Sequence, residues 1–246
     1  MATKATKHQL LRTFLLVLLI VVVSGSNSTI VTTLPGYSGD LPFTLETGYI
    51  GVGDNETSQL FYYFVESQRS PTQDPLVLWI TGGPGCSSLA GFFFESGPLT
   101  FTLGDYNGSL PTLQENPFAW TQNLNIIYMD GPVGTGFSYS ETLDGYIMDD
   151  YKFVAQAYEF LQKWLTEHPQ YQENQLYVGG DSYSGIPIPM IVQQIVIGIE
   201  AGDVPLINLR GYILGNPVTD SYTDMNARVP YAHRLTLISD QLFKVL

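Results

Sequence analysis

Residues 176–185 read LYVGGDSYSG, and this stretch decides the fold. Residues 176–178 are apolar or aromatic and predict a short strand, while the apolar segment 186–199 is mostly helix-like despite its two prolines. A strand, a tight turn with a central serine and a helix together form the layout of a nucleophile elbow. Ser182 is therefore the candidate nucleophile.

The residues around Ser182 are small, which suits so sharp a turn. Side chains larger than those of Gly180, Ser184 and Gly185 would collide at the bend. The serine hydroxyl then stands clear of the sheet near the start of the next helix, whose free N–H groups favour a developing negative charge. At this point a glycine-rich loop around an ordinary serine remains the alternative.

A second glycine-rich turn, TGGPGCSS at residues 81–88, follows an apolar strand predicted over residues 76–80. Acyl transfer by a serine needs two N–H groups that point at the carbonyl oxygen as it becomes negative. In an elbow one donor is the residue after the nucleophile, here Tyr183, and we assign the other to Gly83 in the turn. A phosphate-binding loop is the alternative, but the Lys-Ser/Thr pair of that motif is missing here.

The rest of the chain predicts strands that alternate with helices. Residues 125–129 form a second apolar run, typical of a strand buried on both faces. Residues 149–168 carry apolar side chains at helical spacing, with Asp149 or Asp150 as the cap and Pro169 as the stop. Further strands are predicted at residues 49–53, 60–65 and 209–214, and a polar hairpin connection joins the first two. This order indicates an α/β fold with a mostly parallel central sheet flanked by helices.

Composition favours a folded, acidic protein. The chain has 246 residues, of which 44% are hydrophobic, enough for the core of one α/β domain or most of a larger one. Its net charge is −13, and because Lys4, Lys7 and Arg12 lie in the first 25 residues, the rest holds 7 basic and 23 acidic residues. Such a surface repels nucleic acid and anionic lipid, so neither is an expected partner, and it suits acidic surroundings.

Residues 1–25 predict a cleaved secretory signal peptide. A basic start is followed by ten apolar residues, FLLVLLIVVV at 14–23, and by small residues at 24–26. The apolar run is shorter than the ~20 residues that span a membrane, so no stable membrane anchor is expected after cleavage. Glycosylation sequons follow at Asn27, Asn55 and Asn107. These features predict the secretory pathway, with vacuole and cell exterior as alternatives.

Three motifs resemble the plant serine carboxypeptidase-like proteins: WITGGPGCSS at 79–88, DGPVGTGFSYS at 130–140 and GGDSYSG at 179–185. The resemblance continues through LPGYSGDLPF at 34–43, ETGYIGVGD at 46–54, GNPVTD at 215–220 and HRLTLISDQL at 233–242, and so covers essentially all of residues 26–246. It implies an α/β-hydrolase fold, a Ser-Asp-His triad with Ser182 as nucleophile, and an oxyanion hole from Gly83 and Tyr183. No cofactor or metal is expected.

The resemblance also implies a substrate-binding group at Thr81, Gly82, Glu95 and Asp181. Peptidase members carry an asparagine before the double glycine and a glutamate before the nucleophile, and with a downstream glutamate these grip a terminal carboxylate. Threonine and aspartate at those two positions weaken such a grip. They look more like the branch that transfers acyl groups from glucose esters to alcohols or amines. We expect the carboxyl groups of Asp181 and Glu95 to lie close together.

By the same resemblance, the catalytic aspartate and histidine would lie beyond the end of this chain. The sequence is therefore interpreted as the amino-terminal part of a hydrolase, truncated on its C-terminal side. Of the three histidines, His8 lies in the signal peptide, and His168 and His233 are interpreted as surface residues that flank helices. The single cysteine, Cys86, is either a buried free thiol or a residue whose disulfide partner lies in the absent part.

Three functions stay open. The first is an acyltransferase with a small-molecule acyl donor and acceptor, and the second is a carboxypeptidase that acts on a peptide C-terminus. The third is a catalytically incomplete fragment. A sheet without its last strands is expected to expose an edge and an apolar face, which predicts poor solubility for the chain alone.

Overall fold

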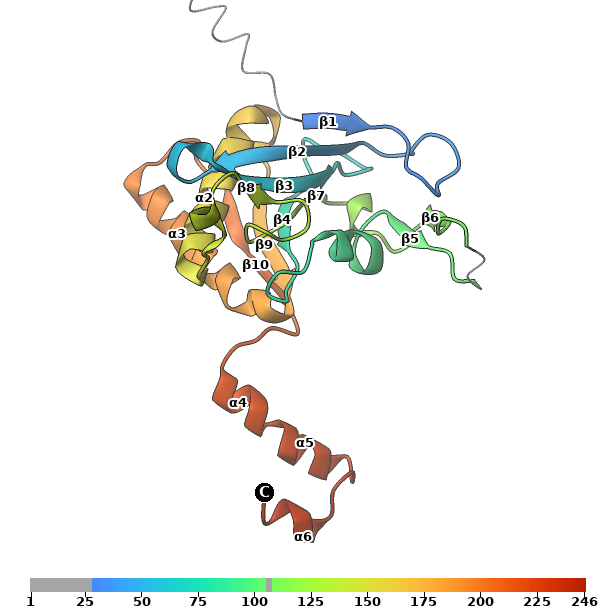
Figure 1. Ribbon diagram of the computed structural model, residues 1–246, viewed down its shortest axis with the longest axis vertical. Helices are drawn as coiled ribbons and strands as arrows, with labels where there is room; N and C mark the ends of the chain where they lie inside the picture. Colours follow the sequence, from blue (N-terminus) through green and yellow to red (C-terminus); the bar gives the residue numbers. More distant parts are fainter. Residues whose placement is uncertain (1–27, 105–107) are drawn as a thin grey trace, which may run out of the picture.

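A sheet of eight strands forms the centre of the computed structural model, which describes residues 28–104 and 108–246 (Figure 1). Seven strands follow the order β1-β2-β3-β7-β4-β9-β10, and the short β8 pairs with β3. Their bounds are β1 Ser28–Val31, β2 Leu45–Val52, β3 Ser58–Val65, β4 Leu76–Ile80, β7 Asn125–Met129, β8 Tyr139–Ser140, β9 Leu176–Asp181 and β10 Leu209–Gly215.

The sheet is mixed. Strands β7, β4, β9 and β10 are parallel to their neighbours within that group, as the alternation of strands and helices predicts. The pairs β1–β2, β2–β3 and β3–β7 are antiparallel. The β2–β3 pair is antiparallel because the two strands are joined by a short turn, and a turn of a few residues can only join antiparallel strands.

The central strands are buried on both faces. Every residue of β4 (LVLWI) and β7 (NIIYM) is buried, which confirms the interpretation of these two apolar runs. Along β4, Leu78 and Ile80 face the core beneath the helices, while Val77 and Trp79 face a second core on the other side. The carboxyl end of β4 is therefore held firmly from both sides, and the glycine-rich turn begins there.

Two long helices, α2 (Asp150–Glu167) and α3 (Pro187–Ala201), cover one face of the sheet (Figure 1). The Asp149 carboxylate caps α2 by accepting a hydrogen bond from the Lys152 N–H, and the helix ends before Pro169, as predicted. The other face is covered by apolar residues of the segment 34–43, by the π-helical turn η2 (Gly91–Glu95), and by the small antiparallel sheet of β5 (Leu99–Phe101) and β6 (Leu113–Glu115).

One helical stretch in the described part of the chain, Ser182–Ala201, is long and apolar enough to cross a membrane by length and composition. Three of its isoleucines, Ile188, Ile191 and Ile195, are buried in the core that also contains α2. Packing against the sheet accounts for these three isoleucines, whereas Val196 and Ile197 on the same helix are exposed.

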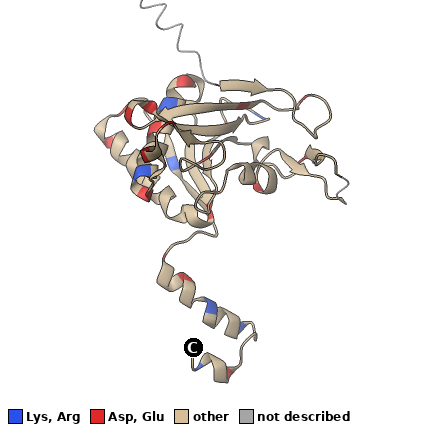
Figure 2. Ribbon diagram, in the orientation of Figure 1, with Lys and Arg blue, Asp and Glu red and all other residues tan. Residues whose placement is uncertain are grey.

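Beyond β10 the chain forms three short helices, α4 (Ser221–Asn226), α5 (Arg228–Arg234) and α6 (Asp240–Phe243), which extend away from the sheet (Figure 1). Strand β10 lies at an edge of the sheet, since β9 is its only partner among the strands of residues 28–104 and 108–246. Asp and Glu outnumber Lys and Arg over the body that carries the sheet (Figure 2).

Candidate active site

The elbow lies at the carboxyl end of β9, where the predicted strand–turn–helix is present. Ser182 begins the 3-10 turn η6 (Ser182–Gly185), which leads directly into α3. Its φ is 55°, a left-handed conformation that non-glycine residues adopt rarely and that is found at strained functional turns. The residue is exposed. The backbone therefore presents the Ser182 hydroxyl to solvent above the sheet.

Close packing explains why the neighbours of Ser182 are small. A methyl group at Gly180 would overlap the carbonyl oxygen of Ile80, and one at Gly185 would overlap the carbonyl oxygen of Val218. The Ser184 hydroxyl donates a hydrogen bond of 2.8 Å to the same Ile80 carbonyl. The turn is thus packed directly against the end of β4.

The glycine-rich turn after β4 touches the elbow. A Cβ on Gly82 would lie 2.8 Å from the Ser182 Cβ and 2.9 Å from the Tyr183 nitrogen, so only glycine fits there. Gly83 follows with a φ of 124°, and its own Cβ would lie 2.8 Å from two backbone nitrogens. The two glycine motifs, about 100 residues apart in the sequence, therefore meet at Ser182.

Two backbone amides, one directly after Ser182 and one directly after Gly82, carry no hydrogen bond to any described residue. In the residues that the structure describes, the N–H groups of Gly83 and Tyr183 have no acceptor, and the Ser182 hydroxyl has no partner. Free N–H groups next to a nucleophile can stabilise the oxyanion of a tetrahedral intermediate. The arrangement can therefore support acyl transfer.

A buried aspartate, Asp130, holds the glycine-rich turn from below. Its Oδ1 accepts hydrogen bonds from the Ser87 hydroxyl at 2.6 Å and the Ser88 N–H at 2.9 Å, and its Oδ2 accepts one from the Phe137 N–H at 3.0 Å. Burial raises the pKa of Asp130 in spite of these bonds. The motif containing Asp130 was recognised in the sequence, but its role in fixing the turn was not.

The predicted substrate-binding group surrounds the same turn. The Gly82 N–H donates a hydrogen bond of 3.1 Å to Oδ1 of Asp181, and the buried Thr81 hydroxyl accepts one of 3.3 Å from Trp79 Nε1. Partial loss of solvent and then repulsion from Asp181 raise the pKa of Glu95, although its side chain remains largely exposed. The charge of Asp181 therefore acts on Glu95, and no direct hydrogen bond joins the two residues.

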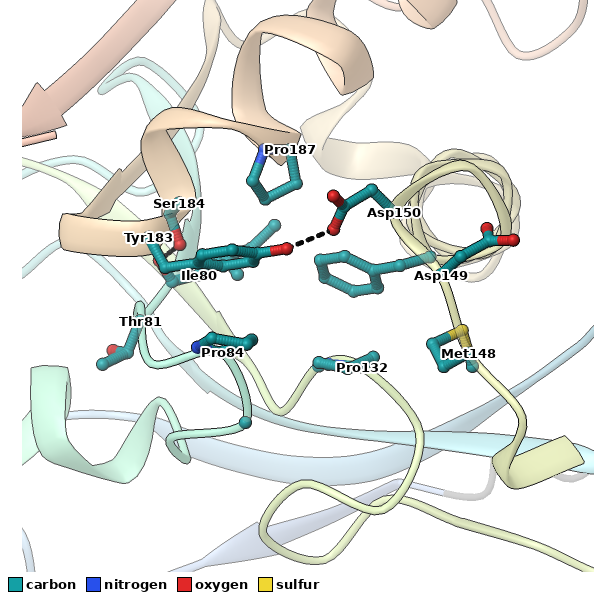
Figure 3. Close-up of a pocket in the computed structure, with 13 residues that line it drawn as sticks. Ile80, Thr81, Pro84, Pro132, Met148, Asp149, Asp150, Tyr183, Ser184 and Pro187 are labelled. Atoms are coloured by element: carbon teal, nitrogen blue, oxygen red, sulfur yellow. Dashed lines mark hydrogen bonds between the residues drawn. The ribbon is translucent and has the colours of Figure 1, made fainter. Parts of the chain in front are cut away.

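A pocket of about 290 Å³ lies beside the elbow, and Tyr183 and Ser184 are among the residues that line it (Figure 3). Ser182 is not one of the lining residues. Its wall is mostly apolar and includes Pro84, Phe153 and Pro187. The Tyr183 ring crosses this wall, and its hydroxyl donates a hydrogen bond of 2.5 Å to Oδ1 of Asp150. Sequence reasoning considered Asp150 only as a helix cap, and no local pattern links it to a tyrosine 33 residues later.

Neither described histidine contacts Ser182. His168 is 6% exposed, so its interpretation as a surface residue was wrong. Its Nδ1 bonds to the Trp164 carbonyl and its Nε2 to Glu46, which occupies both ring nitrogens. His233 is partly exposed, stacks on Phe243, and bonds to Asp240 through Nε2.

Two other predictions concern modified residues. Cys86 is a free thiol and is exposed, so the alternative of a buried thiol was wrong. Asn55 lies in the exposed turn between β2 and β3, whereas Asn27, Asn107 and the predicted signal peptide lie outside the described residues. Within residues 28–104 and 108–246, no group of His, Cys, Asp and Glu is arranged to hold a metal ion.

Comparison with known proteins identifies the family. The sequence profile of the family described as serine carboxypeptidase matches residues 35–246. Serine carboxypeptidase-like 2 from Arabidopsis thaliana is 51% identical over 239 residues, which cover 96% of this chain and 54% of that protein. Serine carboxypeptidase-like 1 from the same plant is 53% identical over 220 residues, covering 89% of this chain and 50% of that protein. The chain spans about half the length of these relatives.

A solved structure confirms the α/β-hydrolase fold. The crystal structure of Kex1(delta)p, a prohormone-processing carboxypeptidase from Saccharomyces cerevisiae, superposes with a TM-score of 0.68 at 24% identity. The superposition covers 80% of this chain and 44% of that chain. The profile match over residues 35–246 and the two plant relatives show that the chain belongs to the serine carboxypeptidase family.

Proposed function

We propose that the full-length form of this protein, including sequence like that of its longer relatives, transfers acyl groups through Ser182. The Ser182 oxygen would attack the carbonyl carbon of an ester, and the N–H groups of Gly83 and Tyr183 would bind the resulting oxyanion. Collapse of the intermediate releases the alcohol and leaves the acyl group on Ser182. By resemblance, a histidine and an aspartate beyond residue 246 would supply the general base and orient it.

We further propose that the acyl donor is a glucose ester and that an alcohol or amine accepts the acyl group. The observation that carries this choice is Thr81, which is buried and whose hydroxyl already accepts a hydrogen bond from Trp79. A carboxamide at this position could donate two N–H groups to the terminal carboxylate of a peptide, and a threonine hydroxyl donates one at most. The site is therefore poorly equipped to hold that carboxylate.

A carboxypeptidase is the second candidate, and the coupled pair of Glu95 and Asp181 favours it. The raised pKa of Glu95 means that this carboxyl group holds a proton at higher pH than usual. A protonated carboxyl group beside a carboxylate can donate a hydrogen bond to the terminal carboxylate of a peptide. Peptide cleavage through this pair would be strongest at acidic pH.

The two candidates separate in one assay of the full-length protein. It is incubated with a 1-O-acyl glucose and an alcohol acceptor, and separately with an N-blocked dipeptide. We expect ester formed on the acceptor, no release of the C-terminal amino acid, and loss of activity by several orders of magnitude in Ser182→Ala. Release of the amino acid without acyl transfer would establish the carboxypeptidase instead. Failure of a fluorophosphonate to label Ser182 would refute both.

The role of Thr81 has its own test. Thr81→Asn restores a carboxamide, and we expect it to raise hydrolysis of the blocked dipeptide about tenfold, the effect of one added hydrogen bond to a charged group. Thr102→Asn is a matched control, because Thr102 is exposed in the segment after β5. Equal dipeptide hydrolysis by wild type and Thr81→Asn would show that Thr81 does not disfavour a peptide substrate.

The 246-residue chain is proposed to lack most of this activity when it is produced alone. Without the base and its orienting aspartate, a serine keeps only the contribution of the oxyanion donors and of binding. Rapid labelling of Ser182 in this chain by a fluorophosphonate would contradict the proposal.

We also propose that the protein enters the secretory pathway, on the strength of residues 1–25 and of the sequon at the exposed Asn55.

A further inference from the structure

The Tyr183 side chain ties the elbow to helix α2. Its hydroxyl donates a hydrogen bond of 2.5 Å to Oδ1 of Asp150, the first residue of α2 (Figure 3). A bond to a carboxylate is short and roughly twice as strong as one between neutral groups. This bond joins the residue after the nucleophile to helix α2, which packs against the sheet.

Helix α2 holds the backbone of Asp150 in a defined position. It begins an 18-residue helix whose inner face is buried, with Phe153 less than one turn further on and in the wall of the same pocket. The preceding residue, Asp149, caps the helix through the Lys152 N–H, so the first turn is well formed. The backbone of Asp150 is therefore fixed by the first turn of α2.

The residue that Asp150 holds is the one whose backbone must be placed accurately. Tyr183 follows Ser182, which has a left-handed φ of 55°, and its N–H has no acceptor among the residues that the structure describes. The peptide unit that carries this N–H has one main-chain hydrogen bond, 2.8 Å long, from the Val218 N–H to the Ser182 carbonyl. The Tyr183 side chain, bonded to Asp150 at its far end, adds a second restraint on the same backbone.

We propose that Asp150 is a positioning residue for acyl transfer: through the Tyr183 hydroxyl it fixes the Tyr183 backbone amide beside Gly83. This inference rests on the proposed function, because acyl chemistry at Ser182 is what the amide would serve. The hydrogen bond that Tyr183 donates to Asp150, and then burial, raise the pKa of Tyr183 to about 12. The hydroxyl therefore keeps its proton, and keeps donating, throughout the physiological pH range.

The backbone effect is measured without any activity. The Ile186 N–H donates a hydrogen bond of 3.0 Å to the Tyr183 carbonyl, so hydrogen exchange of this amide reports the mobility of the Tyr183 backbone. In the 246-residue chain we expect Asp150→Ala and Tyr183→Phe to speed this exchange about tenfold, the effect of losing one hydrogen bond to a charged group. Asp150→Asn keeps an oxygen that accepts the bond, so it should restore most of the protection.

The chemical effect is measured in the full-length protein by labelling of Ser182 with a fluorophosphonate. A misplaced oxyanion donor slows the bond-forming step, so Asp150→Ala should lower the maximal labelling rate about tenfold and leave the reagent concentration at half-maximum unchanged. The double variant of Asp150→Ala and Tyr183→Phe should be no slower than either single variant, since all three lose the same bond.

A second tyrosine–aspartate pair on the same helix provides the matched control. The Tyr158 hydroxyl donates a hydrogen bond of 2.8 Å to Oδ2 of Asp203, and the pKa of Tyr158 is also raised to about 12. This bond joins α2 to the segment after α3, at the far end of that helix from the elbow. Asp203→Ala should leave both the Ile186 exchange and the labelling rate unchanged.

Each result supports or overturns the inference. Faster Ile186 exchange with slower labelling, in Asp150→Ala and not in Asp203→Ala, supports it. Ile186 exchange that is unchanged in Asp150→Ala overturns it. Faster exchange in Asp150→Ala also overturns it if wild type is labelled and the variant is labelled at the same rate. If wild type is never labelled, the proposed function fails, and the exchange of Ile186 alone decides whether Asp150 positions the amide.

Discussion

Nε2 of His168 lies 2.9 Å from Oε1 of Glu46, and Nδ1 of the same ring lies 2.8 Å from the Trp164 carbonyl oxygen. A carbonyl and a carboxylate can only accept, so both ring nitrogens must donate and His168 is an imidazolium. Glu46 also accepts a 2.6 Å hydrogen bond from the Tyr62 hydroxyl, and the Trp164 ring stacks on the imidazole. This ion pair joins the end of α2 to β2.

The ion pair predicts maximum stability in acidic solution. Burial would lower the pKa of His168, but the bonds to Glu46 and Trp164 and the nearby charges of Glu46 and Glu167 raise it. The stability that charged His168 contributes is therefore complete below about pH 6.5 and is lost as the pH rises through the folded pKa. Burial would raise the pKa of Glu46, but His168 and Tyr62 lower it. The stability that charged Glu46 contributes is therefore complete above about pH 4.5 and is lost as the pH falls through the folded pKa. We expect Glu46→Gln to cost about 1.5–3 kcal/mol near pH 5.5 and less at pH 8.5, by denaturant melts.

An exposed ion pair is the control for this prediction. Nζ of Lys163 lies 2.7 Å from Oε1 of Glu56, whose side chain is 63% exposed. Glu56→Gln should cost less than about 1 kcal/mol, with the same value at pH 5.5 and 8.5. A cost of Glu46→Gln that does not change between these two pH values would show that His168 is not charged in the folded protein.

The contact between β4 and β9 predicts that Gly180 cannot be replaced. A methyl group there would overlap the Ile80 carbonyl oxygen and lie 2.7 Å from Cδ1 of Ile188, so Gly180→Ala must push α3 from the sheet. We expect a loss of about 3 kcal/mol in the free energy of unfolding. Gly104→Ala is the control, because nothing lies within 4 Å of its Cβ position, and it should change stability by less than about 1 kcal/mol. Equal melting of the two variants would contradict the close approach.

Both glycine motifs could be predicted from the sequence because local geometry dictates their residue types. At Gly82 and Gly180 the space for a side chain is already filled by backbone or by the neighbouring strand, and a short motif records that constraint. The runs of β4 and β7 were predictable for a similar reason, since a strand covered on both faces is apolar along most of its length.

The features that sequence reasoning missed depend on partners far along the chain. His168 was interpreted as a surface residue, but its partner Glu46 lies 122 residues earlier, and no local pattern announces that contact. The bond between Tyr183 and Asp150 likewise joins two elements that become neighbours only when the sheet forms. Burial of a polar side chain is a tertiary property, so a motif of a few residues carries no record of it.

The hydrogen bonds of Asp130 predict that its amide analogue weakens the glycine-rich turn. Asparagine has one acceptor oxygen, so its NH₂ group would face either the Ser87 and Ser88 donors or the Phe137 N–H. We expect Asp130→Asn to lower the free energy of unfolding by about 1–3 kcal/mol in denaturant melts. The exposed Asp144→Asn should stay within about 0.5 kcal/mol of wild type. A neutral Asp130→Asn would mean that Ser87 and Ser88 do not depend on this carboxylate.

The turn between β2 and β3 predicts a glycan on Asn55. The residue is exposed, with a φ of 54° at the tip of the turn, so a glycosyltransferase can reach it. When the protein is secreted from eukaryotic cells, Asn55→Gln and Thr57→Ala should each remove one step of the mobility shift caused by an endoglycosidase. Thr57→Ser keeps the sequon and should keep that step. Secreted wild type with an unmodified Asn55-containing peptide in mass spectrometry would contradict the prediction.

The free edge of the sheet predicts self-association of the 246-residue chain. Strand β10 pairs only with β9, and its Tyr212 side chain is 53% exposed, so a second chain can add to the unpaired backbone groups along this edge. We expect scattered light to rise with protein concentration, and Tyr212→Lys to reduce it, because a charge on an edge strand opposes pairing. Tyr151→Lys is the control: Tyr151 is also exposed, but it lies on α2, where no backbone groups are free to pair along a strand. A monomeric wild type with a single cooperative melt would show that β10 does not mediate self-association. Equal effects of the two lysine substitutions would assign the association to exposed aromatic surface in general.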